Sequence, residues 1–289
     1  MRIPPAKIYF SKSDRQGILE KIDEALESGQ LTMGKNGQCF ENDFSRYIGT
    51  RYAIGVNSGT SAIEIPLRIF GVQGKEVLVP TNTFFATVLA ILHAGARVRF
   101  LDSDQTNFSI SVESLKENLT EHTAAVVVVH IGGIVSQKMP EIQRICSENN
   151  ILLFEDAAHA HGSLLNGCKA GTFGHAASFS FYPTKVITSA EGGMIVTNDE
   201  KLKNEAMLFR DQGKISFLQN LHDKLGYNWR MSEPHAIIGA AHLARLETFI
   251  GERRSIAKIY DLALSAIAGV SPILEPEGCK SNYYKYMAL

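Results

Sequence analysis

Lys185 follows a strongly apolar run, ASFSFYP, in a place where a charged side chain is not expected. A lysine is costly to bury without a partner, so Lys185 is either a solvated turn residue or an amine held in a pocket for chemistry. A desolvated lysine amine stays nucleophilic. Two glycines, Gly192 and Gly193, precede a second apolar run, MIVTN. The spacing therefore predicts a strand, a turn that carries the lysine, and a second strand.

The segment NSGTSA (57–62) has the residue types of a phosphate site. It joins a predicted strand to a predicted helix, and Gly59 allows a ligand to approach the backbone closely. Thr60 and Ser61 place hydroxyl groups beside the free amides of the helix start, where a phosphate binds well. The same residues also suit an ordinary helix cap, with Ser58 or Thr60 as the capping residue. Both interpretations stay open at this point.

The segment FEDAAHAHG places Glu155 and Asp156 at the carboxyl end of a predicted buried strand. Ligands of open α/β sheets bind at that edge. A carboxylate there needs a cationic partner such as a protonated ring nitrogen, unless it caps a helix or forms a buried ion pair. His159 and His161 follow, but no further ligand cluster lies nearby in the sequence, so we expect no metal.

The lysine, the carboxylate and the phosphate-binding loop together match the needs of one cofactor, pyridoxal phosphate. Lys185 would form the Schiff base with it. The carboxylate of Asp156 would keep the pyridine nitrogen protonated, so that the ring acts as an electron sink.

Five runs rich in Val, Ile and Leu alternate with helix-like segments, and these runs are YAIGV, EVLVP, RVRFLD, AAVVVVH and ILLFEDA. Such alternation indicates a mainly parallel sheet that is covered by helices on both faces, which is a three-layer α/β/α fold. AAVVVVH and ILLFEDA are expected at the centre of the sheet.

Further helices are expected on either side of this alternating region. The first spans 14–28, with Ser13 as its cap and Gly29 at its end, and the second spans 37–48. A long helix at about 232–266 is expected to lead out of the α/β core towards a second domain.

Composition excludes several function classes. The chain has 289 residues, 20% charged residues and a formal net charge of -1, so we expect no nucleic-acid partner. No run approaches the ~20 apolar residues of a membrane span, and the N-terminus does not resemble a signal peptide. The four cysteines are scattered without a CxxC, which favours reduced thiols in a cytoplasmic protein.

The sequence resembles the DegT/DnrJ/EryC1/StrS family of sugar aminotransferases, a branch of the fold type I pyridoxal-phosphate enzymes. The resemblance covers about residues 30–254 in family order. It is carried by GVNSGTSA, VPTNTFFATVLAILHAGARVRFLD, FEDAAHAHGS, GTFGHAASFSFYPTKVITSAEGGMIVTND, FRDQGK and GYNWRMSEPHAIIGAAHLARLETFIGERR.

The resemblance implies roles around the cofactor ring. Lys185 would be the Schiff-base lysine and Asp156 the partner of the pyridine nitrogen. Phe84 would stack on the ring, and Ala158 would pack against its opposite face. His159, where many relatives have Gln, would contact the ring hydroxyl. Phe84 also suits an apolar core position, and His159 suits an ordinary helix start.

The resemblance also implies a phosphate site that two subunits share. Thr60, Ser61 and Ser180 would hold the phosphate of their own subunit. Asn228 would reach the phosphate of the neighbouring subunit, which implies a homodimer with shared active sites. Without a partner, Asn228 would be an ordinary turn residue.

The implied activity is an aminotransferase that moves an amino group, most simply from L-glutamate, to a nucleotide-linked keto sugar in amino-sugar or polysaccharide biosynthesis. Related sugar dehydratases carry histidine at the lysine position, so Lys185 favours transamination. A non-catalytic regulatory protein that binds the cofactor stays open as an alternative. The sequence specifies neither the sugar, the nucleotide nor the position of amination.

The resemblance implies two domains. Residues 1–248 would form the large cofactor-binding domain with an N-terminal helical segment. Residues 249–289 would form a linking helix and the start of an incomplete C-terminal small domain. Relatives continue past this point, so we expect the chain to be either a fragment or a truncated protein.

Overall fold

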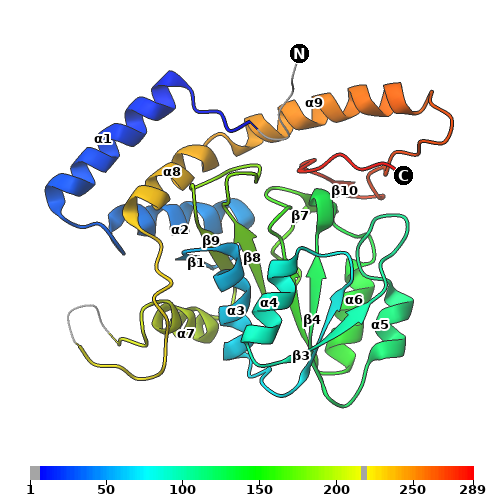
Figure 1. The fold of residues 1–289 in the computed structure, drawn as a ribbon, viewed down its shortest axis with the longest axis horizontal. Helices are drawn as coiled ribbons and strands as arrows, with labels where there is room; N and C mark the ends of the chain where they lie inside the picture. The colour runs from blue at the N-terminus through cyan, green and yellow to red at the C-terminus, as the bar shows by residue number, and fades with distance from the viewer. Residues whose placement is uncertain (1–6, 216–219) are drawn as a thin grey trace.

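Seven strands form the central sheet of the protein, in the order β1-β9-β8-β5-β4-β2-β3 (Figure 1). The structure is a computed structural model that describes residues 7–215 and 220–289. Every neighbouring pair is parallel except those made by β9, which runs antiparallel to both β8 and β1. The strands are β1 (Tyr52–Val56), β2 (Glu76–Pro80), β3 (Arg97–Leu101), β4 (Thr123–Val129), β5 (Leu152–Asp156), β8 (Ala176–Ser180) and β9 (Gly193–Thr197).

The strands β4 and β5 lie at the centre of the sheet, as the apolar runs predicted. Their side chains alternate between two hydrophobic clusters, one on each face. Val126 and Val128 belong to one cluster, and Val127 and Val129 belong to the other. Because both faces are buried, the strands need continuous apolar sequence rather than an alternating pattern.

Helices cover both faces of the sheet, so the predicted three-layer α/β/α fold is confirmed (Figure 1). One face carries α3 (Gly59–Ile69), α4 (Phe85–His93) and α7 (Glu200–Arg210). The other face carries α2 (Lys35–Ile48), α5 (Val112–Asn118) and α6 (Met139–Glu148), with the short 3-10 helix η1 (Ile131–Gly133) after β4.

The first helix, α1 (Lys12–Ser28), begins before the predicted residue 14, and the prediction of Ser13 as its cap was wrong. Ser11 is the cap, because its hydroxyl accepts the Asp14 amide while the Asp14 carboxylate accepts the Ser11 amide. This reciprocal pair satisfies two amides of the helix start at once. Gly29 ends the helix with a left-handed backbone, φ 70°, as expected.

The predicted long helix at 232–266 is two helices, α8 (Glu233–Leu243) and α9 (Leu246–Leu264). At the junction the Arg245 amide donates to the carbonyl of His242, three residues back rather than four. The Arg245 guanidinium donates to Asp14 of α1 at 2.6 Å. The helix is therefore interrupted at Arg245, a residue that is hydrogen-bonded to another helix. The helical spacing of apolar residues continues across this interruption, so the sequence pattern does not reveal it.

The C-terminal segment returns to the core after α9 (Figure 1). Its strand β10 (Cys279–Lys280) pairs with β6 (Leu164–Leu165), which in turn pairs with β7 (Cys168–Lys169). No helix in the described part of the chain is long and apolar enough to cross a membrane.

Candidate active site

A cavity of about 300 Å³ opens at the carboxyl ends of β5 and β8. It brings together residues that the sequence analysis selected from distant segments. The predicted residues that line it are Thr60, Phe84, Asp156, Ala158, His159, Ser180 and Lys185. Ser61 and Asn228 do not line it.

Lys185 lies on the turn between β8 and β9, with its side chain half-buried in this cavity. Its amide donates to the carbonyl of Tyr182 at 2.9 Å, which fixes the turn. Burial lowers the pKa of the Lys185 amine, and Tyr284 and Asp156 act in the opposite direction. A lowered pKa keeps a larger share of the amine uncharged and therefore able to act as a nucleophile or a base.

The structure explains why Gly193, one of the two glycines that follow the lysine, stands at the start of β9. A Cβ at this position would lie 2.2 Å from the carbonyl oxygen of Ser58. Glycine therefore lets β9 lie directly against the loop that follows β1. This contact joins the lysine turn to the predicted phosphate loop.

Asp156 ends β5, and only 5% of its surface is exposed. One carboxylate oxygen accepts the Thr87 hydroxyl at 2.7 Å, and the other accepts the Ala158 amide at 3.1 Å. The carboxylate has four acceptor positions, so it keeps capacity for a partner in the cavity. The sequence analysis missed Thr87, although a threonine inside the apolar segment FFATVLAIL was a usable signal.

The start of α3 provides the predicted phosphate cradle. Ser58 is the N-cap of the helix, because its hydroxyl accepts the Ser61 amide at 3.1 Å. Thr60 lines the cavity, and a Cβ at Gly59 would lie 2.7 Å from the Cβ of Ser180. The glycine therefore lets Ser180 pack closely against the helix start, so that two hydroxyls lie in the cavity beside the amides of α3, an arrangement that suits a phosphate.

Ser61 lies one step away from this cradle. Its side chain is buried, and its hydroxyl donates to the Asn57 side chain at 2.7 Å. The Ser61 hydroxyl therefore shapes the loop beneath the cradle instead of facing the cavity.

His159 has a defined tautomer. Its Nδ1 accepts the Gly132 amide at 3.3 Å, so the proton lies on Nε2. Burial, then Lys185 and Lys285, lowers the pKa of His159 to about 3, and the ring is neutral at physiological pH. The ring stacks on Tyr284 with centroids 4.2 Å apart. Tyr284 was missed by the sequence analysis because its segment, NYYKY, lies far from the other motifs.

Phe84 is not a core residue, because 68% of its surface is exposed. It stands directly before α4 and lines the cavity, and the neighbouring Phe85 is 64% exposed. Ala158 is half-buried in the cavity wall. Asn228 is exposed and forms a β-bridge with Asp211, away from the cavity.

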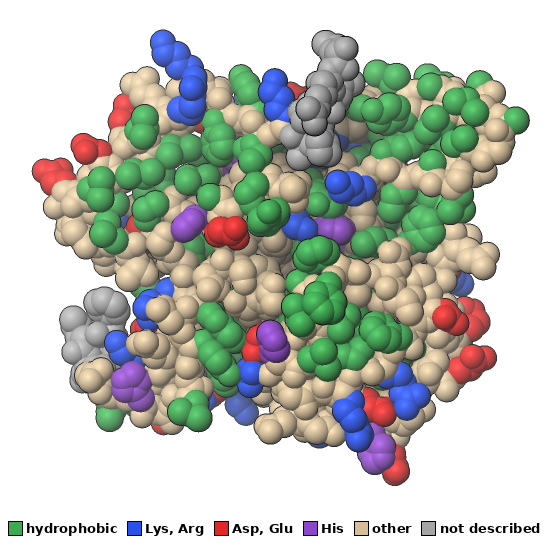
Figure 2. All heavy atoms as spheres, viewed as in Figure 1, with side chains coloured by type: hydrophobic (Ala, Val, Ile, Leu, Met, Phe, Trp, Pro, Cys, Tyr) green, Lys and Arg blue, Asp and Glu red, His purple; other side chains and the backbone are tan. Residues whose placement is uncertain are grey.

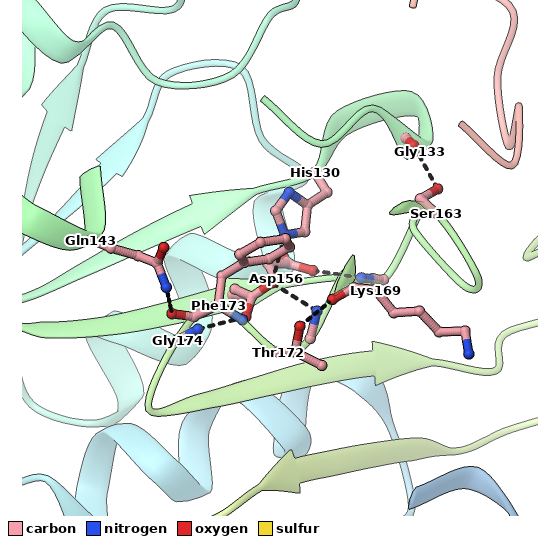
Figure 3. Close-up of polar contacts among 12 residues, drawn as sticks. His130, Gly133, Gln143, Asp156, Ser163, Lys169, Thr172, Phe173 and Gly174 are labelled. Atoms are coloured by element: carbon pink, nitrogen blue, oxygen red, sulfur yellow. Dashed lines mark hydrogen bonds and ion pairs between the residues drawn. The ribbon is translucent and has the colours of Figure 1, made fainter. Parts of the chain in front are cut away.

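Glu155, next to Asp156, is fully buried and belongs to a different network. Figure 3 labels three residues of that network, which are His130, Phe173 and Gly174. Its carboxylate meets Nε2 of His130 at 2.9 Å. It also accepts the amides of Gly171, Phe173 and Gly174, each at 2.7 Å. Glu155 is thus satisfied within the protein, by one histidine ring and three backbone amides, and does not line the cavity. Among residues 7–215 and 220–289, no group of three His, Cys, Asp or Glu side chains is arranged to hold a metal ion.

Comparison with known proteins shows the family to which the chain belongs. The model of the DegT/DnrJ/EryC1/StrS aminotransferase family matches residues 12–289. GDP-perosamine synthase of Escherichia coli O157:H7 is 38% identical over 253 residues, which are 87% of this chain and 69% of that protein.

Two solved structures illustrate the shared fold. Helicobacter pylori PseC, an aminotransferase involved in the biosynthesis of pseudoaminic acid, has a TM-score of 0.91 at 29% identity, over 98% of this chain and 76% of its own. The PLP-form of Spr1654 from Streptococcus pneumoniae has a TM-score of 0.92 at 25% identity, over 100% of this chain and 78% of its own.

Proposed function

Because the chain belongs to the DegT/DnrJ/EryC1/StrS aminotransferase family, we propose that it binds pyridoxal phosphate and transfers an amino group from L-glutamate to a nucleotide-linked keto sugar. Membership confirms the predicted family and the sugar aminotransferase class. One observation carries the proposal further: Lys185, Asp156 and the start of α3 meet in one cavity. These are the amine, the carboxylate and the phosphate cradle that this cofactor requires.

The cavity residues divide the work of binding. The start of α3, with Thr60 and Ser180, binds the phosphate group. Asp156 pairs with the protonated pyridine nitrogen, and Nε2–H of His159 donates to the ring hydroxyl. Phe84 and Ala158 contact the two faces of the ring.

Lys185 does the chemistry of this chain. When bound, pyridoxal phosphate supplies an electron sink for the bonds at the donor's α-carbon. Lys185 anchors the cofactor and, once free, takes the α-proton of the donor as a general base. Its lowered pKa suits this role, because the uncharged amine is the active form.

The substrate class comes from the relatives. Several are named for amino sugars or their nucleotide-linked forms, including GDP-perosamine synthase and a dTDP-3-amino-3,4,6-trideoxy-alpha-D-glucose transaminase. We place the reaction in amino-sugar or polysaccharide biosynthesis. A cytoplasmic location is also proposed, and the four free cysteines support it.

A second copy of the chain is proposed to complete the site. Two exposed aromatic rings, Phe84 and Phe85, stand at or beside the cavity, and such rings are typical of protein interfaces. The exposed Asn228 is free to reach the phosphate of another subunit. Sedimentation equilibrium tests whether the chain is a dimer. Asn228→Ala is expected to weaken cofactor binding by about tenfold, while the dimer stays associated.

The division into residues 1–248 and 249–289 also stays a proposal. Hydrophobic side chains gather over α9 (Figure 2), among them Ile256, Ile259 and Leu262, each more than half exposed. This surface supports a C-terminal domain that covers the helix. Limited proteolysis tests the boundary, and the expected first cuts lie after residue 248.

The main test is an absorbance titration of the purified chain. Pyridoxal phosphate is added first, and the visible band of the covalently bound cofactor is expected. L-glutamate is then expected to convert this band to that of the pyridoxamine form. Lys185→Ala should abolish the first band, whereas Lys75→Ala, which removes an exposed lysine, should not.

Two other outcomes would change the assignment. A band that glutamate leaves unchanged would favour the alternative of a regulatory protein that binds the cofactor. Loss of water from a keto sugar without nitrogen transfer would favour a dehydratase. No band at all would contradict the proposed cofactor site.

A further inference from the structure

The C-terminal segment enters the cavity from outside the central sheet. Asn282 is fully buried, and its side-chain amide donates to the carbonyls of His159 and His161, both at 2.9 Å. Its side-chain oxygen accepts the Tyr284 amide at 2.9 Å. The segment that carries Tyr284 is therefore tied to the turn that carries His159.

The ring of Tyr284 is fixed in the cavity wall, with 8% of its surface exposed. It stacks on His159 at 4.2 Å, and its hydroxyl lies 3.3 Å from the hydroxyl of Thr184. Nζ of Lys185 lies over the ring, 5.0 Å from its centroid. A cation within about 6 Å of an aromatic face is attracted to it, more strongly when it is desolvated.

We propose that Tyr284 is a positioning residue for Lys185: its ring holds the free ε-ammonium group and sets the pH at which the amine becomes available. The inference rests on the role of Lys185 in the proposed function. Burial lowers the pKa of Lys185. The Tyr284 ring face, 5.0 Å from Nζ, favours the charged form and so offsets part of this effect. The Tyr284 hydroxyl acts in the same direction as the ring. While Lys185 is released during the reaction, the ring keeps the amine beside the reacting centre.

Other charged groups also face Lys185, and one of them, Lys285, lies over the same Tyr284 ring at 5.1 Å. In the cavity, Asp156 raises its pKa and Lys285 lowers it, while His159 and His161 are neutral. Glu191 lines the same cavity. A second cavity, on the α9 side, places five more titratable groups near the lysine, and these are Lys7, Tyr9, His242, Glu252 and Arg253.

The test measures the amine itself in the 289-residue chain with no cofactor added. The chain is treated with limiting acetic anhydride over a pH series, and acetylation of Lys185 is quantified by peptide mass spectrometry relative to Lys75. Tyr284→Leu is expected to lower the midpoint of the Lys185 profile by about one pH unit, because the ring no longer favours the ammonium form. Tyr284→Phe keeps the ring and removes only the hydroxyl, so its shift should be clearly smaller than that of Tyr284→Leu.

Two further variants keep the test decisive. Tyr286→Leu makes the same substitution in the same segment, on a tyrosine that bonds Asp261 and does not line the cavity. It should leave the Lys185 midpoint unchanged. Tyr284→Met is measured in parallel, so that poor folding of the leucine variant does not end the experiment, and it should shift the midpoint in the same direction.

An unchanged midpoint in both Tyr284→Leu and Tyr284→Met would overturn the proposal. An equal shift in Tyr284→Phe would assign the effect to the hydroxyl and would also overturn it. The outcome does not depend on cofactor binding. A chain that binds no pyridoxal phosphate contradicts the proposed function, while the acetylation profiles still decide the role of Tyr284.

Discussion

Two neighbouring carboxylates at the end of β5, Glu155 and Asp156, have different hydrogen-bond partners on the two faces of the sheet. Because side chains alternate along a strand, Glu155 and Asp156 point to opposite faces. Glu155 accepts one histidine nitrogen and three backbone amides, whereas Asp156 accepts Thr87 and one amide and lines a cavity. Burial is similar, so the difference lies in how completely the protein satisfies each charge. A buried carboxylate with remaining acceptor capacity at a cavity is the better candidate for ligand binding.

The largest expected effect is on activity, through Asp156→Asn. The substitution keeps the shape but removes the negative charge opposite the pyridine nitrogen. We expect kcat/KM for transamination to fall by about a hundredfold or more, with little change in unfolding midpoint. Steady-state kinetics and thermal melting measure the two quantities. Full activity in this variant would contradict the proposal that Asp156 is a cofactor-binding carboxylate.

Glu155→Gln should show the opposite profile. One of its terminal atoms becomes an NH₂ group that faces amide donors, so the free energy of unfolding should fall by about 3 kcal/mol. The activity of the folded fraction should stay close to that of the parent chain. Urea unfolding measures the loss. Glu141→Gln, at an exposed pair with Lys116, is the matched control and should cost less than about 1 kcal/mol.

Acid should also lower the stability of the fold, through His161 on the face of the sheet that carries Glu155. This ring is fully buried beside Phe179 and Phe181, and burial lowers the pKa of His161 to about 3. As the pH falls below about 6.5, the unfolded chain binds a proton that the folded chain does not, so stability decreases. Urea midpoints measure this, and by pH 5 the loss is expected to be about 2 kcal/mol.

His161→Leu should make that pH dependence less steep, because His159 and His242, whose pKa values are also lowered by burial, still contribute to it. His122→Leu, at an exposed histidine, should leave it as steep as in the parent chain. If both variants lose stability in acid as the parent does, His161 is not the group responsible.

The smallest effect is expected for Thr87→Val, which removes one hydrogen bond to Asp156 and keeps the side-chain shape. Activity should fall by about tenfold, because the carboxylate loses a donor that orients it. The pH profile of kcat/KM distinguishes this from simple loss of fold. A variant with parental kinetics would show that the Ala158 amide is sufficient to orient Asp156.

Sequence alone predicted a mainly parallel sheet with β4 and β5 at its centre, and seven of the nine predicted site residues line the cavity. This was possible because Asp156 ends an apolar strand and Thr60 and Lys185 lie shortly after one, and the ends of parallel strands meet at one edge. The roles of these residues in binding stay predictions.

The missed features depend on contacts between distant segments. Tyr284 joins the cavity only through Asn282, which no periodic pattern reveals. The break between α8 and α9 at Arg245 likewise depends on Asp14 of α1. Ser11 and Ser13 are both acceptable helix caps by residue type, and only the position of Asp14 decides between them.

The reversed strand β9 has a consequence for how the chain reaches this structure. Residues 52–56 of β1 pair with residues 193–197 of β9, and Val56 also forms a β-bridge with Arg230. This edge of the sheet therefore cannot form until the ribosome has released these later segments. Such non-local pairing is slow, because bringing two segments that are distant in the sequence together costs chain entropy. Residues 57–61, which include the start of α3, follow β1 directly. The phosphate cradle should therefore be among the last parts to form. Refolding followed at β1 should therefore lag behind β4 and β5.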